Sequence, residues 1–448
     1  MRSLSRLSVV PTTEFLGNFD PCRPRMLVAG SMPRTAKPGV AIPGGHRIRC
    51  GRGMTCMKLG FRLWSPQEPT RESGKADSVR WKSRFKDPMG KGKKVAVENV
   101  RGGEDLWDAA AVAEQGSYPE HLVIMVNGLV GSAEDWRFAA EQFVKKLPDK
   151  VIVHRSECNT SRLTFDGVDL MGERLAEEVR SVVKQRGGVQ KISFVAHSLG
   201  GLVARYAIGR LYEPSTRVEP PADAKDQFDE EGSLDGRIAG LEPMNFITFA
   251  SPHLGSRGHK QIPFLCGLPF LERRASETAH LIVGRTGKHL FLTDSADGRP
   301  PLLLRMVDDC DDIKFRSALR SFKRRVAYAN ANYDHIVGWR TSSIRRQHEL
   351  PKHHLLVEDD KYPHVVFVDK GNVVIKHNKV LVDREAQKYD LEEEMIRGLT
   401  QVPWERVDVS FQKSRQRYVA HNTIQVKSYW LNSDGADVVF HMIDNFLI

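Results

Sequence analysis

The stretch "KISFVAHSLGGLVARYAIG", residues 191–209, runs from an unbroken apolar segment through one serine and two glycines into a helical pattern. A buried strand that turns at once into a helix favours a layered α/β fold with a parallel sheet. At so sharp a turn, the residues two before and two after the serine must be small, and here they are Ala196 and Gly200. We therefore expect Ser198 to be an exposed nucleophile, with Gly200 and Gly201 making room for the turn. A serine that only caps a helix is the alternative.

Five further segments are short apolar runs like the one before Ser198. They are "HLVIMVNG" (121–128), "KVIVHRSECN" (150–159), "MNFITFASP" (244–252), "RRVAYANANYD" (324–334) and "ERVDVSF" (405–411). Helical periods lie between the early segments, at 132–147 and at 165–183, and the second has an apolar stripe at Val168, Met171, Leu175 and Val182. Strands that alternate with helices predict a doubly wound, mostly parallel α/β sheet with right-handed crossovers.

The positive charge of the chain lies mainly at its beginning. The 448 residues have a formal net charge of +11, and residues 1–66 hold eleven Lys or Arg against two acidic residues. This segment also contains many Ser and Thr and is interrupted by Pro and Gly, which is typical of a disordered organellar transit peptide. We expect a chloroplast location, with cytoplasmic and mitochondrial locations as alternatives. The remaining chain is nearly neutral, so we expect no nucleic-acid partner.

The body divides into a lead-in and one large domain. Residues 67–118 are charged and Gly-rich, and we interpret them as a linker and lead-in, with the α/β domain over 119–448. The long connection at 256–300 contains the apolar cluster "IPFLCGLPFLE" (262–272), which suggests a lid. Phe264 and Phe270 of this cluster are candidate pocket residues that would face acyl chains or a membrane surface, and a buried cap helix is the alternative.

A second long connection, at 345–400, is expected to be an insertion. It carries the hairpin-like "HVVFVDKGNVVIKHN" (364–378) followed by a charged helical pattern. Six cysteines are scattered through the chain without CxxC spacing, which predicts reduced thiols and no zinc site. The adjacent His353 and His354 lack a second ligand pair, so we expect no metal there, and no cofactor motif is present.

The segment "VNGLVGSAEDW" (126–136) follows the first strong apolar run. Gly128 would let the backbone approach a substrate carbonyl. The amide of Leu129 would then pair with the amide of Leu199, directly after the serine, to hold a developing oxyanion. A plain turn from strand to helix is the alternative interpretation.

Taken together, the segment from about 119 to 448 resembles the plant putative serine esterase family of lipase-like α/β hydrolases. The motifs that carry the resemblance are "HLVIMVNGLVGSAEDW", "TFDGVDLMGERLAEEV", "FVAHSLGGLVARYAIG", "ITFASPHLGS", "GRTGKHLFLTD", "RRVAYANANYDHIVGWRTSSIRR" and "AHNTIQVK". The resemblance implies an α/β-hydrolase fold, a triad in the chain order serine, acid, histidine, and activity on lipid or acyl esters.

The acid and the base of such a triad can be chosen by position. Asp334 ends the strand expected two places beyond the nucleophile strand and matches the family's D-x-x-V turn, whereas Asp294 in "FLTDSADG" is the rival. His421 follows the last expected strand by ten residues, in a loop where its imidazole could take the serine proton. Its rival His441 lies in an apolar terminal helix, where a histidine is more often simply buried.

Two other histidines are candidate pocket residues. His197 precedes the serine, but the geometry of the turn points it away from the substrate, which leaves it as part of the pocket wall. His253 follows another strand end and could line an acyl site, although a simple turn histidine is the more ordinary interpretation.

These observations predict a serine carboxylic-ester hydrolase for lipid or acyl esters that uses Ser198, His421 and Asp334, forms an acyl-enzyme and contacts membranes peripherally. An acyltransferase that passes the same acyl group to an alcohol is one alternative. A binding module that uses the fold without catalysis is the other.

Overall fold

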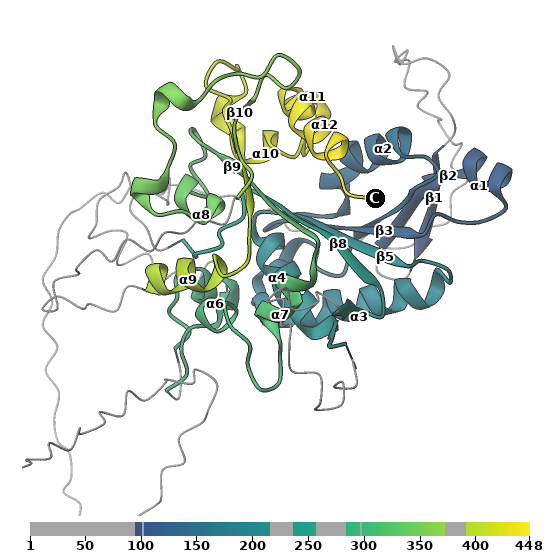
Figure 1. Cartoon of the computed structure of the whole chain (residues 1–448), viewed down its shortest axis with the longest axis horizontal. Helices are drawn as coiled ribbons and strands as arrows, with labels where there is room; N and C mark the ends of the chain where they lie inside the picture. The colour runs from purple at the N-terminus through teal and green to yellow at the C-terminus, as the bar shows by residue number, and fades with distance from the viewer. Residues whose placement is uncertain (1–94, 101–102, 216–235, 257–283, 296–297, 372–390) are drawn as a thin grey trace, which may run out of the picture. The chain divides into compact units, whose positions relative to one another are not determined.

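The computed structural model describes residues 95–100, 103–215, 236–256, 284–295, 298–371 and 391–448 (Figure 1). The segment at 1–66 lies outside these residues, and so do Phe264 and Phe270. The transit peptide, the lid and its two phenylalanines therefore stay predictions.

Among the described residues, nine strands form one sheet. In spatial order they are β1 (Val95–Val100), β2 (Gly103–Asp108), β4 (Val151–Ser156), β3 (His121–Val126), β5 (Lys191–His197), β8 (Glu242–Phe249), β9 (Arg324–Asn330), β11 (Glu405–Val409) and β10 (Val365–Asp369). The six strands from β4 to β11 pair in parallel, and the outer strands pair antiparallel at both edges. The predicted mostly parallel α/β sheet is confirmed, because its central strands are the six apolar segments.

Helices cover both faces of the sheet (Figure 1). On one face lie α3 (Val168–Gln185), α4 (Leu199–Leu211), α6 (Leu302–Arg305), α7 (Phe315–Ser321) and α9 (Leu391–Leu399); on the other lie α2 (Arg137–Lys146), α10 (Ala420–Thr423), α11 (Tyr429–Asn432) and α12 (Ala436–Asp444). Helix α1 (Ala109–Gln115) connects β2 to β3, and α8 (Trp339–Ser343) follows β9. The predicted stripe on α3 is fully packed into one of two cores, since Leu175 and Val182 are completely buried.

Several shorter elements complete the fold. Strands β6 (Tyr212–Glu213) and β7 (Arg237–Ile238) form a small second sheet. The 3₁₀ helices are η1 (Ala133–Trp136), η2 (Ser161–Phe165), η4 (Gln347–Glu349), η5 (His353–Leu355), η6 (Arg417–Val419) and η7 (Ser433–Gly435).

The sheet begins before the boundary that we expected. Residues 95–100 and 103–108, which we expected in a lead-in, form β1 and β2, and β2 pairs with β4. The sequence of these strands is polar, so we did not expect them in the sheet. Asp105 is nevertheless buried, because its carboxylate oxygens form ion pairs, 2.6 Å from His154 Nδ1 and 2.6 Å from Arg186 Nε. Charged residues reach the interior of a protein only when they are paired in this way.

The expected insertion at 345–400 contributes to the main sheet. The expected first arm of the hairpin is β10, which pairs antiparallel with β11. The expected second arm falls within residues 372–390, which lie outside the described ranges. Among the described residues, Cys158 is a free thiol.

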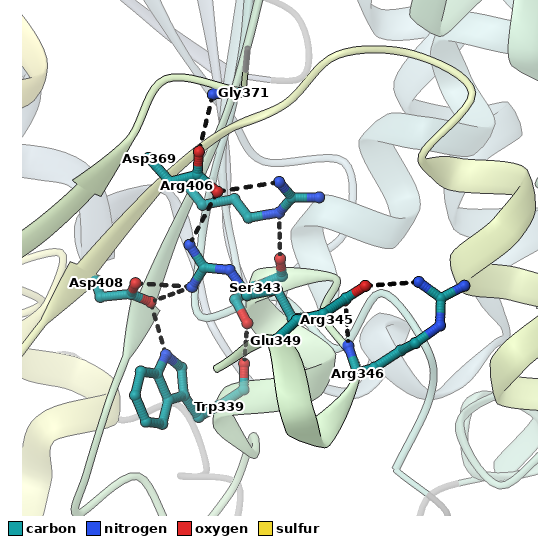
Figure 2. Close-up of polar contacts among 9 residues, drawn as sticks. All are labelled: Trp339, Ser343, Arg345, Arg346, Glu349, Asp369, Gly371, Arg406 and Asp408. Carbon is teal, nitrogen blue, oxygen red and sulfur yellow. Dashed lines mark hydrogen bonds and ion pairs between the residues drawn. The ribbon is translucent and has the colours of Figure 1, made fainter. Parts of the chain in front are cut away.

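A buried network of charged side chains ties the segment after β9 to the far edge of the sheet (Figure 2). Arg345, 3% exposed, donates from Nη1 to both carboxylate oxygens of Asp408 on β11, at 2.9 and 2.7 Å. Trp339 donates its indole N–H to the same carboxylate at 2.6 Å, and Asp369 on β10 lies 3.3 Å from Arg406. The network therefore fastens the segment that follows Asp334 to strands β10 and β11.

Candidate active site

Ser198 lies where β5 ends and α4 begins, as the pattern predicts. Its backbone has a φ of 53° and a ψ of −126°, a conformation that residues other than glycine rarely adopt. The backbone is held there by a 2.8 Å hydrogen bond from the Ser198 amide to the Phe249 carbonyl at the end of β8. Ser198 therefore sits on a sharp, strained turn at the carboxyl edge of the sheet.

Two glycines after the serine are required by close packing. A Cβ atom at Gly200 would lie 2.5 Å from the Asn127 carbonyl oxygen and 2.6 Å from that of Val126. A Cβ atom at Gly201 would lie within 2.7 Å of the Ser251 side chain. The absence of side chains thus lets α4 begin directly against the end of β3.

His421, on α10, makes hydrogen bonds with both ring nitrogens. Its Nε2 lies 3.0 Å from the Ser198 hydroxyl, and its Nδ1 lies 3.0 Å from Oδ2 of Asp334. Because a carboxylate only accepts, Nδ1 carries the proton and Nε2 is free to accept the serine O–H. The structure thus brings together Ser198, His421 and Asp334 from three distant parts of the chain.

Asp334 is held as a buried carboxylate in the turn after β9. Its Oδ1 accepts the amides of Ile336 at 3.0 Å and Val337 at 2.9 Å, and its Oδ2 also accepts from the Asn330 side chain at 2.9 Å. Burial alone would raise the pKa of Asp334, but the charge and hydrogen bond of His421, with those other donors, keep it below the ordinary value. The ionised acid is therefore stable without contact with water.

His197 has a different place from the pocket wall that we expected. It is buried, and its Nε2 donates to the backbone carbonyl of His421 at 2.7 Å. Burial, followed by the nearby charge of His421, holds the pKa of His197 well below its usual value. A neutral His197 thus holds the backbone carbonyl of His421. This contact joins distant segments and leaves no pattern in the sequence.

The loop after β3 is fixed by side chains that the sequence did not single out. Asn127 donates to the carbonyls of Gly128 at 3.1 Å and Asn159 at 3.0 Å, and the Val130 amide donates to Thr164 Oγ1 at 3.0 Å. A Cβ atom at Gly128 would lie 3.0 Å from that of Ser198, so the loop directly adjoins the serine. The Leu129 amide has no backbone acceptor among the described residues. As the first residue of α4, Leu199 likewise has an amide without an intrahelical acceptor.

The three remaining candidates lie elsewhere. Asp294 accepts the Leu302 amide at 2.7 Å, and His441 is buried with its Nδ1 2.9 Å from the Tyr328 hydroxyl. His253 does not match the acyl-site position that we considered, because it is completely buried and lies 3.0 Å from the Thr248 hydroxyl. Being packed against the core, His253 has no face left for a substrate.

In the described part of the chain, no group of three or more His, Cys, Asp or Glu side chains could hold a metal ion, and His353 and His354 lie exposed on η5. The helices found there are all too short or too polar to cross a membrane.

One known protein family matches the part of the chain that contains Ser198 and Asp334. The family described as "Putative serine esterase (DUF676)" matches residues 116–344, slightly more than half of the chain. The match includes Ser198 and Asp334 and ends before His421.

Two curated yeast proteins are each similar to about half of this chain. Putative lipase ROG1 of Saccharomyces cerevisiae is 31% identical over 244 residues, covering 54% of this chain and 31% of its own length. Putative lipase C4A8.10 of Schizosaccharomyces pombe is 28% identical over 251 residues, which cover 54% of this chain and 28% of its own length. The chain thus spans about a third of the length of these relatives, and they do not show the plant origin that we expected.

A solved structure aligns over more of the chain. Carboxyl esterase 2 from the mycorrhizal fungus Tuber melanosporum covers 79% of this chain and 89% of its own, with 12% identity and a TM-score of 0.36.

Proposed function

The chain belongs to the putative serine esterase family, and from this membership together with the site geometry we propose that it hydrolyses carboxylic esters through an acyl-enzyme on Ser198. The observation that carries the proposal is the chain of two 3.0 Å hydrogen bonds from Ser198 through His421 to Asp334. A serine is a weak nucleophile unless an adjacent base removes its proton, and this arrangement supplies the base and a group that orients it.

In the first half of the reaction, Ser198 Oγ attacks the ester carbonyl carbon while its proton moves to Nε2 of His421. The carbonyl oxygen becomes an oxyanion, which the amides of Leu129 and Leu199 would hold. Asp334 stabilises the imidazolium. When the C–O bond to the leaving alcohol breaks, His421 returns the proton to that alcohol, and the acyl group stays on Ser198.

In the second half, water attacks the acyl carbon and gives its proton to His421. The carboxylic acid leaves, and the proton returns to Ser198. We propose lipid or acyl esters as substrates, because the curated relatives are described as lipases.

Hydrolysis of p-nitrophenyl esters of increasing acyl length by the full chain tests the proposal. The expected result is turnover by the parent and a loss of roughly 10⁶-fold in kcat for Ser198→Ala. A parent and a variant that are folded and equally active would overturn it.

Two alternatives give different outcomes in the same assay. An acyltransferase would release nitrophenol much faster when an alcohol acceptor is added, and the acyl ester of that alcohol would replace the free acid as product. A binding module would be inert and would leave Ser198 unlabelled by a serine-reactive fluorophosphonate.

A further inference from the structure

Five large apolar side chains are exposed within the short stretch that surrounds His421. Their exposed fractions are 66% for Tyr418, 44% for Val419, 58% for Tyr429, 88% for Trp430 and 62% for Leu431. We call these residues, with Arg415 and Arg417, the α10–α11 surface. Arg417, Tyr418 and Val419 form η6, which leads directly into α10, and α10 and α11 lie next to each other in yellow in Figure 1. A concentration of exposed apolar side chains marks a surface that meets an apolar partner.

The exposure does not come from a loose chain end. Asn432 closes α11 by accepting the Ser428 amide at 3.1 Å, and its side-chain amide donates to Thr423 Oγ1 of α10 at 3.0 Å. The Tyr429 ring stacks on Phe138 of α2, with centroids 5.0 Å apart. Trp430 and Leu431 are therefore held outward on a fixed element that is bonded to the helix of His421.

The same surface carries positive charge without carboxylate partners. Arg415 is exposed, and Arg417 lies over the rings of Tyr333 and Tyr418 at 5.6 and 4.8 Å and bonds to the Tyr418 hydroxyl. Within the described ranges, neither arginine has a carboxylate at ion-pair distance. Lys427, in contrast, is paired with Asp135 at 3.0 Å. Arg415, and Arg417 beside the exposed Tyr418 ring, thus have charge left for an external partner.

The chemistry of this surface matches a lipid bilayer. Tryptophan and tyrosine prefer the boundary between headgroups and acyl chains, and arginines at that depth attract anionic headgroups. We propose that the α10–α11 surface docks the protein on an anionic lipid surface, through insertion of Trp430 and Leu431 and headgroup contacts of Arg415 and Arg417. This inference rests on the proposed ester hydrolysis, since Val419 is two residues from His421 and docking would bring the site to its substrates.

Vesicle sedimentation with the full-length Ser198→Ala protein measures docking without hydrolysis. Vesicles of phosphatidylcholine with phosphatidylglycerol should bind the protein more strongly than phosphatidylcholine alone. Replacing Trp430 and Leu431 together by serine should weaken binding roughly tenfold or more, from the apolar area lost. Replacing Arg415 and Arg417 by glutamine should weaken binding to the anionic vesicles by a similar factor and should hardly change binding to phosphatidylcholine.

A matched control removes exposed apolar side chains far from this surface. Val97 on β1 is 56% exposed and Tyr118, before the amino end of β3, is 45% exposed. Replacing both by serine should leave vesicle binding unchanged. Parent protein that does not sediment with anionic vesicles, or a Trp430 and Leu431 variant that binds like the parent, would overturn the proposal. So would a dimer in analytical ultracentrifugation that only the Trp430 and Leu431 variant abolishes, because a second copy would then be the occupant.

Ester hydrolysis rates of the same surface variants, measured with Ser198 retained, separate this inference from the proposed function. If short-chain soluble esters are cleaved and vesicles are not bound, the docking surface alone is wrong. If vesicles are bound as expected but no ester is cleaved, the proposed hydrolysis fails, and the docking measurement still stands.

Discussion

His197 donates its Nε2 proton to the backbone carbonyl of His421 at 2.7 Å, and the two rings lie 4.7 Å apart. His421 is otherwise oriented by its own side-chain bonds to Ser198 and Asp334. The contact therefore fixes the main chain of the residue whose ring would accept the serine proton in the proposed reaction.

We expect His197→Ala to lower kcat by roughly 10- to 100-fold with little change in KM, because a lost buried hydrogen bond lets the His421 backbone move. Steady-state hydrolysis of a soluble ester measures both constants. His441→Ala is the matched control: it removes another buried histidine, bonded to Tyr328, and should reduce stability while kcat stays near that of the parent. Equal loss of kcat in both variants would contradict a positioning role for His197.

The assignment of Asp334 as the triad acid can be tested by replacing each candidate aspartate with asparagine. Asp334→Asn should reduce kcat by roughly 10⁴-fold, because an amide cannot stabilise the imidazolium and favours the wrong tautomer of His421. Asp294→Asn should leave kcat within about threefold, because Asp294 accepts a bond from the Leu302 amide that an asparagine can still make, and its other neighbour, His289 at 3.9 Å, is outside the proposed triad. A larger loss for Asp294→Asn than for Asp334→Asn would reverse the assignment.

The buried His154 gives stability a pH dependence. Burial lowers the pKa of His154, but Asp105 and Glu178 outweigh this and raise it to about 9. Because the folded pKa exceeds the unfolded value near 6.5, this contribution is complete below about pH 6.5 and is lost as pH rises through about 9. The melting temperature of the parent should therefore decrease as the pH rises from about 6.5 to about 9. His154→Gln should have a lower melting temperature at pH 6.5 and a smaller decrease over this range. Parallel pH profiles for parent and variant would refute the assignment.

Two neighbouring arginines should differ strongly in their effect on stability. Arg345→Met leaves the fully buried Asp408 without its cation, which should cost about 3–5 kcal/mol in the free energy of unfolding. Arg346→Met removes ion pairs to Glu349 and Glu393 that are partly exposed, and the cost should be about 1 kcal/mol or less. Urea denaturation of both variants measures the difference. Similar midpoints would show that the network in Figure 2 contributes little to folding.

The turn after Ser198 should not tolerate one added methyl group. Gly200→Ala places Cβ against the carbonyls of Val126 and Asn127, next to the Gly128 loop, so we expect about 1–3 kcal/mol of destabilisation and loss of most ester hydrolysis. At Gly187 an added Cβ meets nothing within 4 Å. Gly187→Ala should therefore change stability by less than about 1 kcal/mol and leave the rate unchanged, as thermal unfolding and the ester assay can show.

The central sheet could be predicted because parallel strands are buried on both faces. β3, β5 and β8 are therefore continuous apolar runs, and the parallel topology brings the ends of β5 and β9 to one edge. Ser198 and Asp334 each follow such an end, and His421 follows β11, which made them recognisable by position.

The edge strands and the supporting contacts left weaker signals. β2 reads as polar because Asp105 is buried in an ion pair, and the pairing of β10 with β11 left no local pattern because the two strands are distant in the chain. His197 and Asn127 act through backbone carbonyls of His421 and Asn159, which any residue could supply. Such contacts depend on three-dimensional proximity alone, so one sequence could not reveal them.

The backbone strain at Ser198 sets two evolutionary pressures against each other. Its φ of 53° and ψ of −126° cost about 1–3 kcal/mol for a residue with a side chain, whereas glycine adopts them freely. A glycine at this position would relieve that strain and remove the proposed nucleophile. Under the proposed function, a duplicated gene released from selection for this chemistry would be free to exchange the serine for glycine, so selection for the proposed reaction would be what keeps a serine there.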